Sequence, residues 1–309
     1  MIMENNKDTY QRITDYVIEQ LDKGEIVWQK GWNTYGLPRN AVTANTYQGW
    51  NAFFLNFVTM YNEYKTPYFL TYKQAMDKGG TIRRGQKGYA IIWWATMEDK
   101  SKIVNTNESG EAEYLQYRVP KTHVVFNIDQ TYGIEFPQVE KPFRTHTEKI
   151  HACEKVINEM NDRPLIKHGG DKAYYIPSID AITLPPVEMF HSDQAYYKTL
   201  FHELAHSTGH VSRLNRKEIN RFKKFGDENY SREELTAELT AAFLSAICGI
   251  EANTINNSAA YIQGWLNQLK NDKKLILKAA SQAQAAADYI LNKSSVSNIK
   301  EQVKESITI

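Results

Sequence analysis

The chain has 309 residues, 42% of them hydrophobic and 24% charged, which is an ordinary balance for a globular protein with a hydrophobic core. No run approaches the roughly 18 consecutive apolar residues of a membrane span, and the N-terminal stretch has no apolar signal-peptide core. The two cysteines, Cys153 and Cys248, lie in unrelated contexts and indicate neither a disulfide framework nor a cysteine-based zinc site. We therefore expect a cytoplasmic protein without a membrane segment.

The net charge of +1 conceals a basic block near the N-terminus. Residues 23–94 contain six Lys and three Arg against one Asp and two Glu, whereas acids outnumber bases in residues 1–22 and 95–150. A basic block inside a nearly neutral chain is typical of a surface that binds an anionic partner.

The elements expected from periodicity indicate an α+β fold in two domains. In chain order we expect a helix at 8–21, a short helix within 71–80, strands at 89–97 and 117–128, a helix at 145–161, a strand–turn–strand at 173–186, helices at 193–208 and 231–247, and nearly continuous helix over 258–292. The polar stretch between the first two strands reads as an exposed hairpin insertion. Residues 136–145 are polar and contain two prolines, so we predict domains at 1–135 and 146–309 joined by this linker.

The sequence HELAH at 202–206 lies in a segment whose apolar residues recur with helical spacing. His202 and His206 would be one turn apart on the same helix face, where two imidazoles can bind one zinc ion. Glu203 would then face the open coordination position and act as general base on the zinc-bound water, whose pKa the metal lowers to about 7. The alternative is an ordinary helix with three solvated polar residues, but these residues adjoin an apolar stripe where unpaired polar groups are costly. We predict one Zn²⁺ per chain.

A third protein ligand has to come from elsewhere, because the longer motif HExxHxxGxxH is broken by serine at position 212. The helix at 231–247 offers Glu234 and Glu238, one turn apart on one face. We predict that Glu234 binds the metal and that Glu238 holds a ligand histidine by its other ring nitrogen. Ser231 and Glu234 also fit a capping box, and if Glu234 only caps the helix, Glu238 becomes the third ligand.

The basic block also contains many aromatic residues, and cations interleaved with rings are what single-stranded DNA requires, for its phosphates and its bases. The sequence GGTIRRGQKG at 79–88 indicates a basic turn between a helix and a strand. The opposing interpretation is that aromatic residues at strand spacing belong to the core and that basic loops are merely solvated. The candidate DNA-binding residues are Trp28, Lys30, Trp32, Arg39, Tyr47, Arg83, Arg84 and Lys87.

Long segments of the chain resemble one protein family. In the C-terminal half these are SIDAITLPP, YYKTLFHELAHSTGHVSRLNR and SREELTAELTAAFL; in the N-terminal half they are WQKGWN, PYFLTYKQAMDKGGTIRRGQKGYAIIWW and VFNIDQTYGI. The chain is similar, over most of its length, to ArdC-type antirestriction proteins, which plasmids, phages and other mobile elements carry. The resemblance implies an N-terminal domain that binds single-stranded DNA, a C-terminal zincin-like metallopeptidase domain, and a role in protecting incoming DNA from restriction during transfer.

Three functions are consistent with these features. In the first, the DNA-binding half brings an active zinc peptidase to a protein substrate at DNA. In the second, the protein is a DNA-binding shield whose zincin fold is not catalytically active. In the third, the protein is a peptidase whose N-terminal half binds the protein substrate. The presence of Glu203 favours the first, because a vestigial site is free to lose its base.

Overall fold

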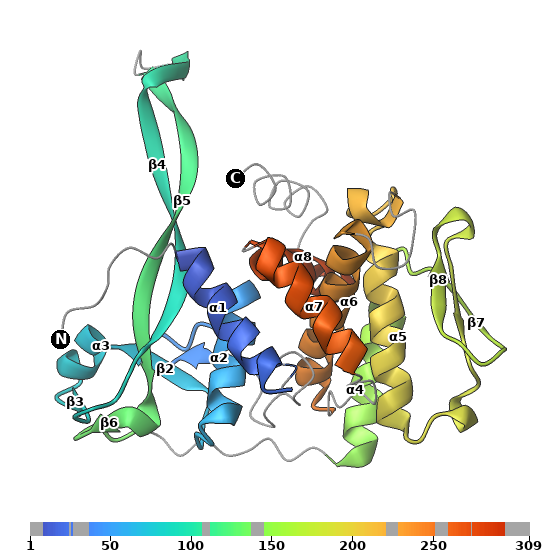
Figure 1. Ribbon diagram of the computed structural model, residues 1–309, viewed down its shortest axis with the longest axis horizontal. Helices are drawn as coiled ribbons and strands as arrows, with labels where there is room; N and C mark the ends of the chain where they lie inside the picture. The colour runs from blue at the N-terminus through green and yellow to red at the C-terminus, as the bar shows by residue number, and fades with distance from the viewer. Residues whose placement is uncertain are drawn as a thin grey trace. The chain divides into compact units, whose positions relative to one another are not determined.

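The computed structural model describes residues 9–24, 26, 37–106, 112–136, 145–220, 228–250, 259–272 and 274–293. Helices and strands occur in both halves of the chain, as expected for an α+β protein (Figure 1). Contacts divide the chain into two compact units. The first comprises Met1–Arg39, Asn45–Pro67 and Gln138–Ile309, and the second comprises Asn40–Ala44 and Tyr68–Pro137.

The compact units do not follow the division by sequence order that was expected at 136–145. Helices α1 (Thr9–Asp22) and α2 (Gly49–Tyr61) pack against α7 and α8 of the first unit. The reason lies in the composition of α2, which is buried along nearly its whole length and therefore needs apolar partners on several sides. Independent folding of residues 1–135 stays a prediction.

The second unit is built on antiparallel strands. Its elements are β2 (Tyr68–Thr71), α3 (Tyr72–Asp77), β3 (Thr81–Ile82), β4 (Tyr89–Thr106), β5 (Ala112–Asn127), η1 (Ile128–Gln130) and β6 (Thr131–Tyr132). The strand order of the larger sheet is β1-β2-β5-β4, where β1 is Arg39–Asn40, and β3 pairs with β6. Thr71 caps α3 in a capping box with Gln74, so the short helix begins where its sequence predicts.

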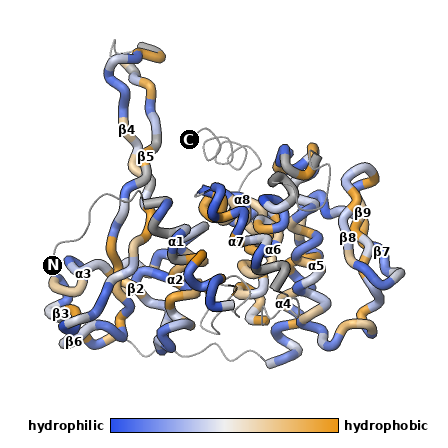
Figure 2. The backbone as a smooth tube through the Cα atoms, viewed as in Figure 1, coloured by the Kyte–Doolittle hydropathy of each residue, from blue (hydrophilic) through white to orange (hydrophobic). Residues whose placement is uncertain are grey.

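Strands β4 and β5 are longer than the sequence predicted. Their antiparallel pairing runs from Tyr89 opposite Val125 to Thr106 opposite Ala112, with register shifts between Asp99 and Asn105. The polar stretch forms a hairpin, as expected, but it continues the two strands instead of interrupting them, because a two-stranded ribbon needs no buried face to satisfy its backbone hydrogen bonds. Figure 2 shows hydrophobic and hydrophilic stretches alternating along this ribbon.

The first unit contains the helices that carry the HELAH sequence. Its remaining elements are α4 (His146–Glu159), β7 (Leu165–His168), β8 (Tyr174–Ile176), η2 (Pro177–Ile179), β9 (Ala181–Leu184), η3 (Val187–Met189), α5 (Asp193–Thr208), η4 (Lys217–Asn220), α6 (Glu228–Cys248), α7 (Ala259–Asn271) and α8 (Leu275–Ile290). The three strands have the order β7-β9-β8, with β7 parallel and β8 antiparallel to the central β9.

The core of this unit lies among α5, α6 and α8. Helix α6 packs against both neighbours, and α8 presents small buried alanines that allow a close approach (Figure 1). The nearly continuous helix expected over 258–292 is in fact two helices. The backbone carbonyl and side chain of Asp272 accept hydrogen bonds from the backbone N–H groups of Leu275 and Lys274, which closes a turn between α7 and α8.

No helix in the described part of the chain is both long and apolar enough to cross a membrane. Both cysteines are buried and free.

Candidate functional site

Helix α5 carries the two histidines at the position expected. The Ser192 hydroxyl accepts a hydrogen bond from the backbone N–H of Ala195 at 3.2 Å and caps the start of the helix. The apolar face of the helix is buried, which fixes the opposite, polar edge. As a result, the imidazoles of His202 and His206 lie together, with their Nε2 atoms 3.1 Å apart.

Helix α6 brings Glu234 to the same point. Its two carboxylate oxygens lie 3.5 Å from Nε2 of His202 and 3.4 Å from Nε2 of His206. One ligand atom from each of the three residues falls within 4.8 Å of the others, as a group that can surround one metal ion. We call His202, His206 and Glu234 the metal cluster.

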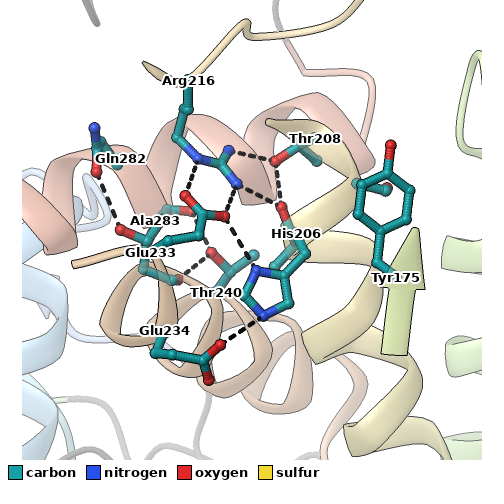
Figure 3. Close-up of polar contacts among 12 residues, drawn as sticks. Tyr175, His206, Thr208, Arg216, Glu233, Glu234, Thr240, Gln282 and Ala283 are labelled. Carbon is teal, nitrogen blue, oxygen red and sulfur yellow. Dashed lines mark hydrogen bonds and ion pairs between the residues drawn. The ribbon is translucent and has the colours of Figure 1, made fainter. Parts of the chain in front are cut away.

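The outward-facing ring nitrogens of the two histidines have carboxylate neighbours. Nδ1 of His206 lies 3.2 Å from Oε1 of Glu233, and Nδ1 of His202 lies 3.9 Å from Oε1 of Glu238. Glu233 is in turn bound by the guanidinium of Arg216, through contacts of 2.9 and 2.6 Å (Figure 3). Each imidazole therefore has one nitrogen directed to the cluster and one directed to a carboxylate, the usual arrangement around a metal-binding histidine.

The capping alternative for Glu234 is wrong, because α6 already begins at Glu228 and Ser231 is a helical residue. Glu234 is only partly buried and faces both histidines, whereas Glu238 faces only the far nitrogen of His202. These distances favour Glu234 as the third metal ligand. They favour Glu238 as the residue that supports the ligand His202.

The charges of the cluster shift the pKa of each member. Burial lowers the pKa of His206, but the charge of Glu234 and the hydrogen bond to Glu233 outweigh it and raise that pKa well above its ordinary value. Burial raises the pKa of Glu234, but the two histidines more than offset it and hold the pKa well below its usual range. A metal ion bound at the cluster would have to displace the additional proton that the two glutamates favour on His206, because a ligand imidazole is neutral.

Sequence reasoning missed three buried residues around the cluster. Glu233 and Arg216 form the ion pair behind His206, and Lys198 lies on α5 one turn before His202, close enough to Glu238 for their charges to interact. No spacing rule relates Arg216 to α6, because it lies in the irregular segment between the helices. The available signal was the adjacent pair of glutamates in REEL, of which only the second had an assigned role.

Glu203, the predicted base, lies beside His202 on α5 and is 7% exposed. Among the described residues its carboxylate makes no hydrogen bond or ion pair with another side chain. Its oxygens are not among the fully buried, unpaired side-chain atoms of the described residues, so the carboxylate remains available to a ligand and is a candidate for chemistry.

The predicted DNA-binding residues fall into three groups. Trp28, Lys30 and Trp32 lie outside the described residues. Arg39 and Tyr47 are partly exposed and belong to the first compact unit, whereas Arg83, Arg84 and Lys87 are exposed in the second. We call residues 83–87 the basic turn. It connects β3 to β4, whereas the sequence indicated a turn between a helix and a strand, because the two-residue β3 is too short to give a periodic signal.

Within the basic turn the cations differ. The side chain of Arg83 donates from Nε to the carbonyl of Thr131 at 2.9 Å and so helps to hold the turn against β6. The side chain of Tyr132, the next residue of β6, is 72% exposed, and Tyr132 pairs with Thr81. Sequence reasoning missed this exposed ring, because a single tyrosine in a two-residue strand carries no periodic signal.

The tryptophans of the basic block divide between core and surface. Trp50 is buried and stacks on Phe54 with ring centroids 5.3 Å apart, so it belongs to the core. Trp93 on β4 is 52% exposed and meets His123 edge to face at 5.7 Å. Exposure, and not the identity of the residue, separates a candidate base-stacking ring from a structural one.

Comparisons with known proteins agree with this architecture. Residues 7–126 match the N-terminal domain of the anti-restriction factor ArdC, and residues 151–282 match the zincin-like metallopeptidase family. The DNA primase TraC of Escherichia coli is 33% identical over 303 residues, which cover 93% of this chain and 27% of the primase. The chain therefore spans about a quarter of the length of this relative.

Two crystal structures of the antirestriction protein ArdC from plasmid R388 are similar to the whole chain. The metal-free structure is 34% identical, with a TM-score of 0.72, and the match covers 94% of this chain and 99% of ArdC. The Mn(II)-bound structure is 32% identical, with a TM-score of 0.70, covering 98% and 100%. Full-length similarity at this identity, together with both domain matches, shows that the chain belongs to the ArdC family of antirestriction proteins, with an N-terminal ArdC domain and a C-terminal zincin-like domain.

Proposed function

We propose that this protein is a zinc metallopeptidase that binds single-stranded DNA and protects the DNA of a mobile element from restriction in the cytoplasm. The observation that carries the proposal is the convergence of His202, His206 and Glu234 within 4.8 Å. Two imidazoles and one carboxylate are the protein ligands of many catalytic zinc sites, which leave a coordination position open for substrate or water.

The surroundings of the cluster support a bound metal. The carboxylate beside Nδ1 of His206 favours the tautomer with its proton on Nδ1, which leaves the Nε2 lone pair directed at the cluster. The R388 relative is described as Mn(II)-bound, which supports a divalent ion at this site. The choice of zinc rests on the nitrogen-rich ligand set, since Mn²⁺ prefers oxygen ligands.

In this proposal, metal binding and proton transfer are carried out by different residues of the chain. A zinc ion held here would supply Lewis-acid activation of a water molecule. Glu203 would accept the proton of that water, because it directly follows the ligand His202 on helix α5. Glu234 and the two histidines would hold the ion and take no part in proton transfer.

The proposal for DNA rests on the second compact unit. The basic turn presents the exposed side chains of Arg84 and Lys87, and the exposed rings of Trp93 and Tyr132 lie in the same unit. Cations attract the phosphates, and rings stack on unpaired bases of any sequence. Duplex DNA would bind less well to such a surface, because its base faces are already stacked on one another. A protein bound at DNA is the substrate class that we propose for the peptidase.

The variant Glu203→Gln tests whether the zincin domain is an active peptidase. We expect it to keep its metal and to lose proteolysis by about 10²- to 10⁴-fold, the usual contribution of a general base. Antirestriction should be measured in parallel with the wild-type protein. Lost proteolysis with full antirestriction would favour the alternative function, a DNA-binding shield that needs no catalysis.

Binding of the full-length protein to labelled single-stranded and duplex oligonucleotides of the same sequence tests the DNA proposal. We expect preference for the single strand and an affinity that falls as salt rises. Equal affinity for both forms would contradict recognition by stacking on exposed rings.

A further inference from the structure

We propose that the buried pair Arg216–Glu233 is a positioning device that fixes the orientation and proton of His206 for metal binding. The inference rests on the proposed metal site and adds residues to it. Its basis is a continuous chain of contacts from Arg216 through Glu233 and His206 to Glu234, which Figure 3 displays.

The first link is the contact of Glu233 with His206. Oε1 of Glu233 lies 3.2 Å from Nδ1, so in the neutral imidazole that a metal binds it is Nδ1 that keeps the proton and donates it to Glu233. The opposite nitrogen, Nε2, is then left as an acceptor, and it lies 3.4 Å from Glu234 and 3.1 Å from Nε2 of His202. The hydrogen bond thereby selects both the rotation of the ring and the nitrogen that is available to a metal.

The second link holds Glu233 itself. Arg216 donates two hydrogen bonds to its carboxylate, from Nε at 2.9 Å and from Nη2 at 2.6 Å. This two-point contact permits one orientation of the carboxylate plane. The side chains of Arg216 and Glu233 are 0% and 1% exposed, so water does not compete for either partner.

Arg216 also ties the carboxylate to the end of α5. Its Nη1 donates to Oγ1 of Thr208 at 2.6 Å and its Nη2 to the carbonyl of Ala205 at 2.7 Å. Ala205 and Thr208 flank His206 in the last turn of the helix. The guanidinium of Arg216 therefore fixes the position of the Glu233 carboxylate on α6 relative to the turn of α5 that carries the ligand His206.

Gly209 provides the space for this guanidinium. Its φ of −75° is available to any residue, so the backbone does not require glycine. A Cβ at this position would instead lie 3.1 Å from Nη2 and 3.2 Å from Cζ of Arg216. The glycine that follows HELAHST thus serves the Arg216 contact, and Gly209→Ala should displace the guanidinium by a few tenths of an ångström.

The same loop supplies a matched control. Arg213 is also buried and binds Asp180, the hydroxyl of Tyr175 and the carbonyl of Ser207. Among the described residues it makes no hydrogen bond or ion pair with His202, His206 or Glu234, so it is a buried arginine with structural partners only. Asp180→Asn breaks the ion pair of this buried arginine with a partly exposed carboxylate, without touching the metal cluster.

The experiment measures the Zn(II) affinity of full-length metal-free protein by competition with a chromophoric chelator, and its thermal unfolding before metal is added. The variants are Glu233→Gln, the double variant Arg216→Met/Glu233→Gln, and Asp180→Asn. We expect Glu233→Gln to weaken Zn(II) binding by about 10- to 100-fold. Glu233→Gln alone leaves Arg216 as an unpaired buried charge and can prevent folding. The double variant removes both charges, so no unpaired buried ion remains and the protein can be tested in its folded state.

A purely structural role and a positioning role predict different results for the double variant. We expect it to unfold near the wild-type temperature and still to bind Zn(II) at least 10-fold more weakly, while Asp180→Asn keeps its affinity within about twofold. Wild-type affinity in a folded double variant would overturn the inference. A wild-type protein that binds no Zn(II) would instead overturn the proposed function, and with it the basis of this inference.

Discussion

The metal cluster and the basic turn are both charged, but the cluster is largely buried and the basic turn is exposed to solvent. In the cluster, the side chains of His202, His206 and Glu234 are 12–24% exposed and contact one another. The buried ion pair Arg216–Glu233 contacts the far side of His206. In the basic turn, Arg84 and Lys87 extend into solvent. Buried charges depend on one another's geometry, whereas exposed charges act nearly independently and are screened by salt.

This difference predicts how each region responds to substitution. Loss of one member of the cluster should change the whole site, because the remaining ligands cannot close around an ion. Loss of one cation from the basic turn should subtract a small, additive share of DNA affinity. The following predictions test that contrast, beginning with the largest expected effect.

The variant His206→Ala should reduce bound metal from about one ion per chain to nearly none, because two protein ligands form a poor zinc site. Elemental analysis after dialysis against a metal-free buffer measures this content. His210→Ala is the matched control, since His210 bonds to Ser212 and is not a member of the cluster. Equal metal content in the two variants would contradict the site.

A comparison of Glu234→Gln with Glu238→Gln should rank the two acids of α6. Glu238→Gln is expected to weaken metal affinity about 10- to 100-fold, as for a residue that supports a ligand, and Glu234→Gln should weaken it further. Competition with a chelator gives both affinities under the same conditions. The reverse order would make Glu238 the third ligand.

The variant Asp180→Asn should lower the free energy of unfolding by about 1–2 kcal/mol at neutral pH, at the low end for charged hydrogen bonds because Asp180 is partly exposed. Burial raises the pKa of Asp180, but hydrogen bonds from Arg213 and Tyr175 outweigh it and lower that pKa. The stabilisation is therefore complete above the ordinary Asp pKa of about 4 and is lost as the pH falls through the lowered value. Denaturant unfolding of both proteins from pH 7 to pH 2 should show the difference shrink only at the acid end.

The double variant Arg84→Ala/Lys87→Ala should flatten the dependence of log affinity for single-stranded DNA on log salt by about 1.4, since each lost phosphate contact contributes roughly 0.7. Arg83 is left unchanged because its Nε already bonds to Thr131. Lys102→Ala is the control, as this exposed lysine pairs with Asp99 at 3.7 Å in the same unit. An unchanged slope in the double variant would mean that the basic turn is only a solvated surface.

The sequence by itself determined the local parts of this protein. Helical periodicity places His202 and His206 on one face of α5 and Glu234 and Glu238 on one face of α6, because 3.6 residues per turn fix such positions within a single element. The capping serine of α5 and the capping box of α3 also follow from short-range hydrogen bonds. Family resemblance added the order of the two domains.

Only the tertiary structure decided which local parts meet. The packing of α6 on α5 turns Glu234 toward both histidines and brings Glu233 behind His206, and no spacing in the chain links Arg216 to either helix. Similarly, the burial of Trp50 and the exposure of Trp93 depend on neighbours far away in sequence. Contacts across elements depend on the packing of several surfaces at once, which a pattern along one strand or helix does not contain.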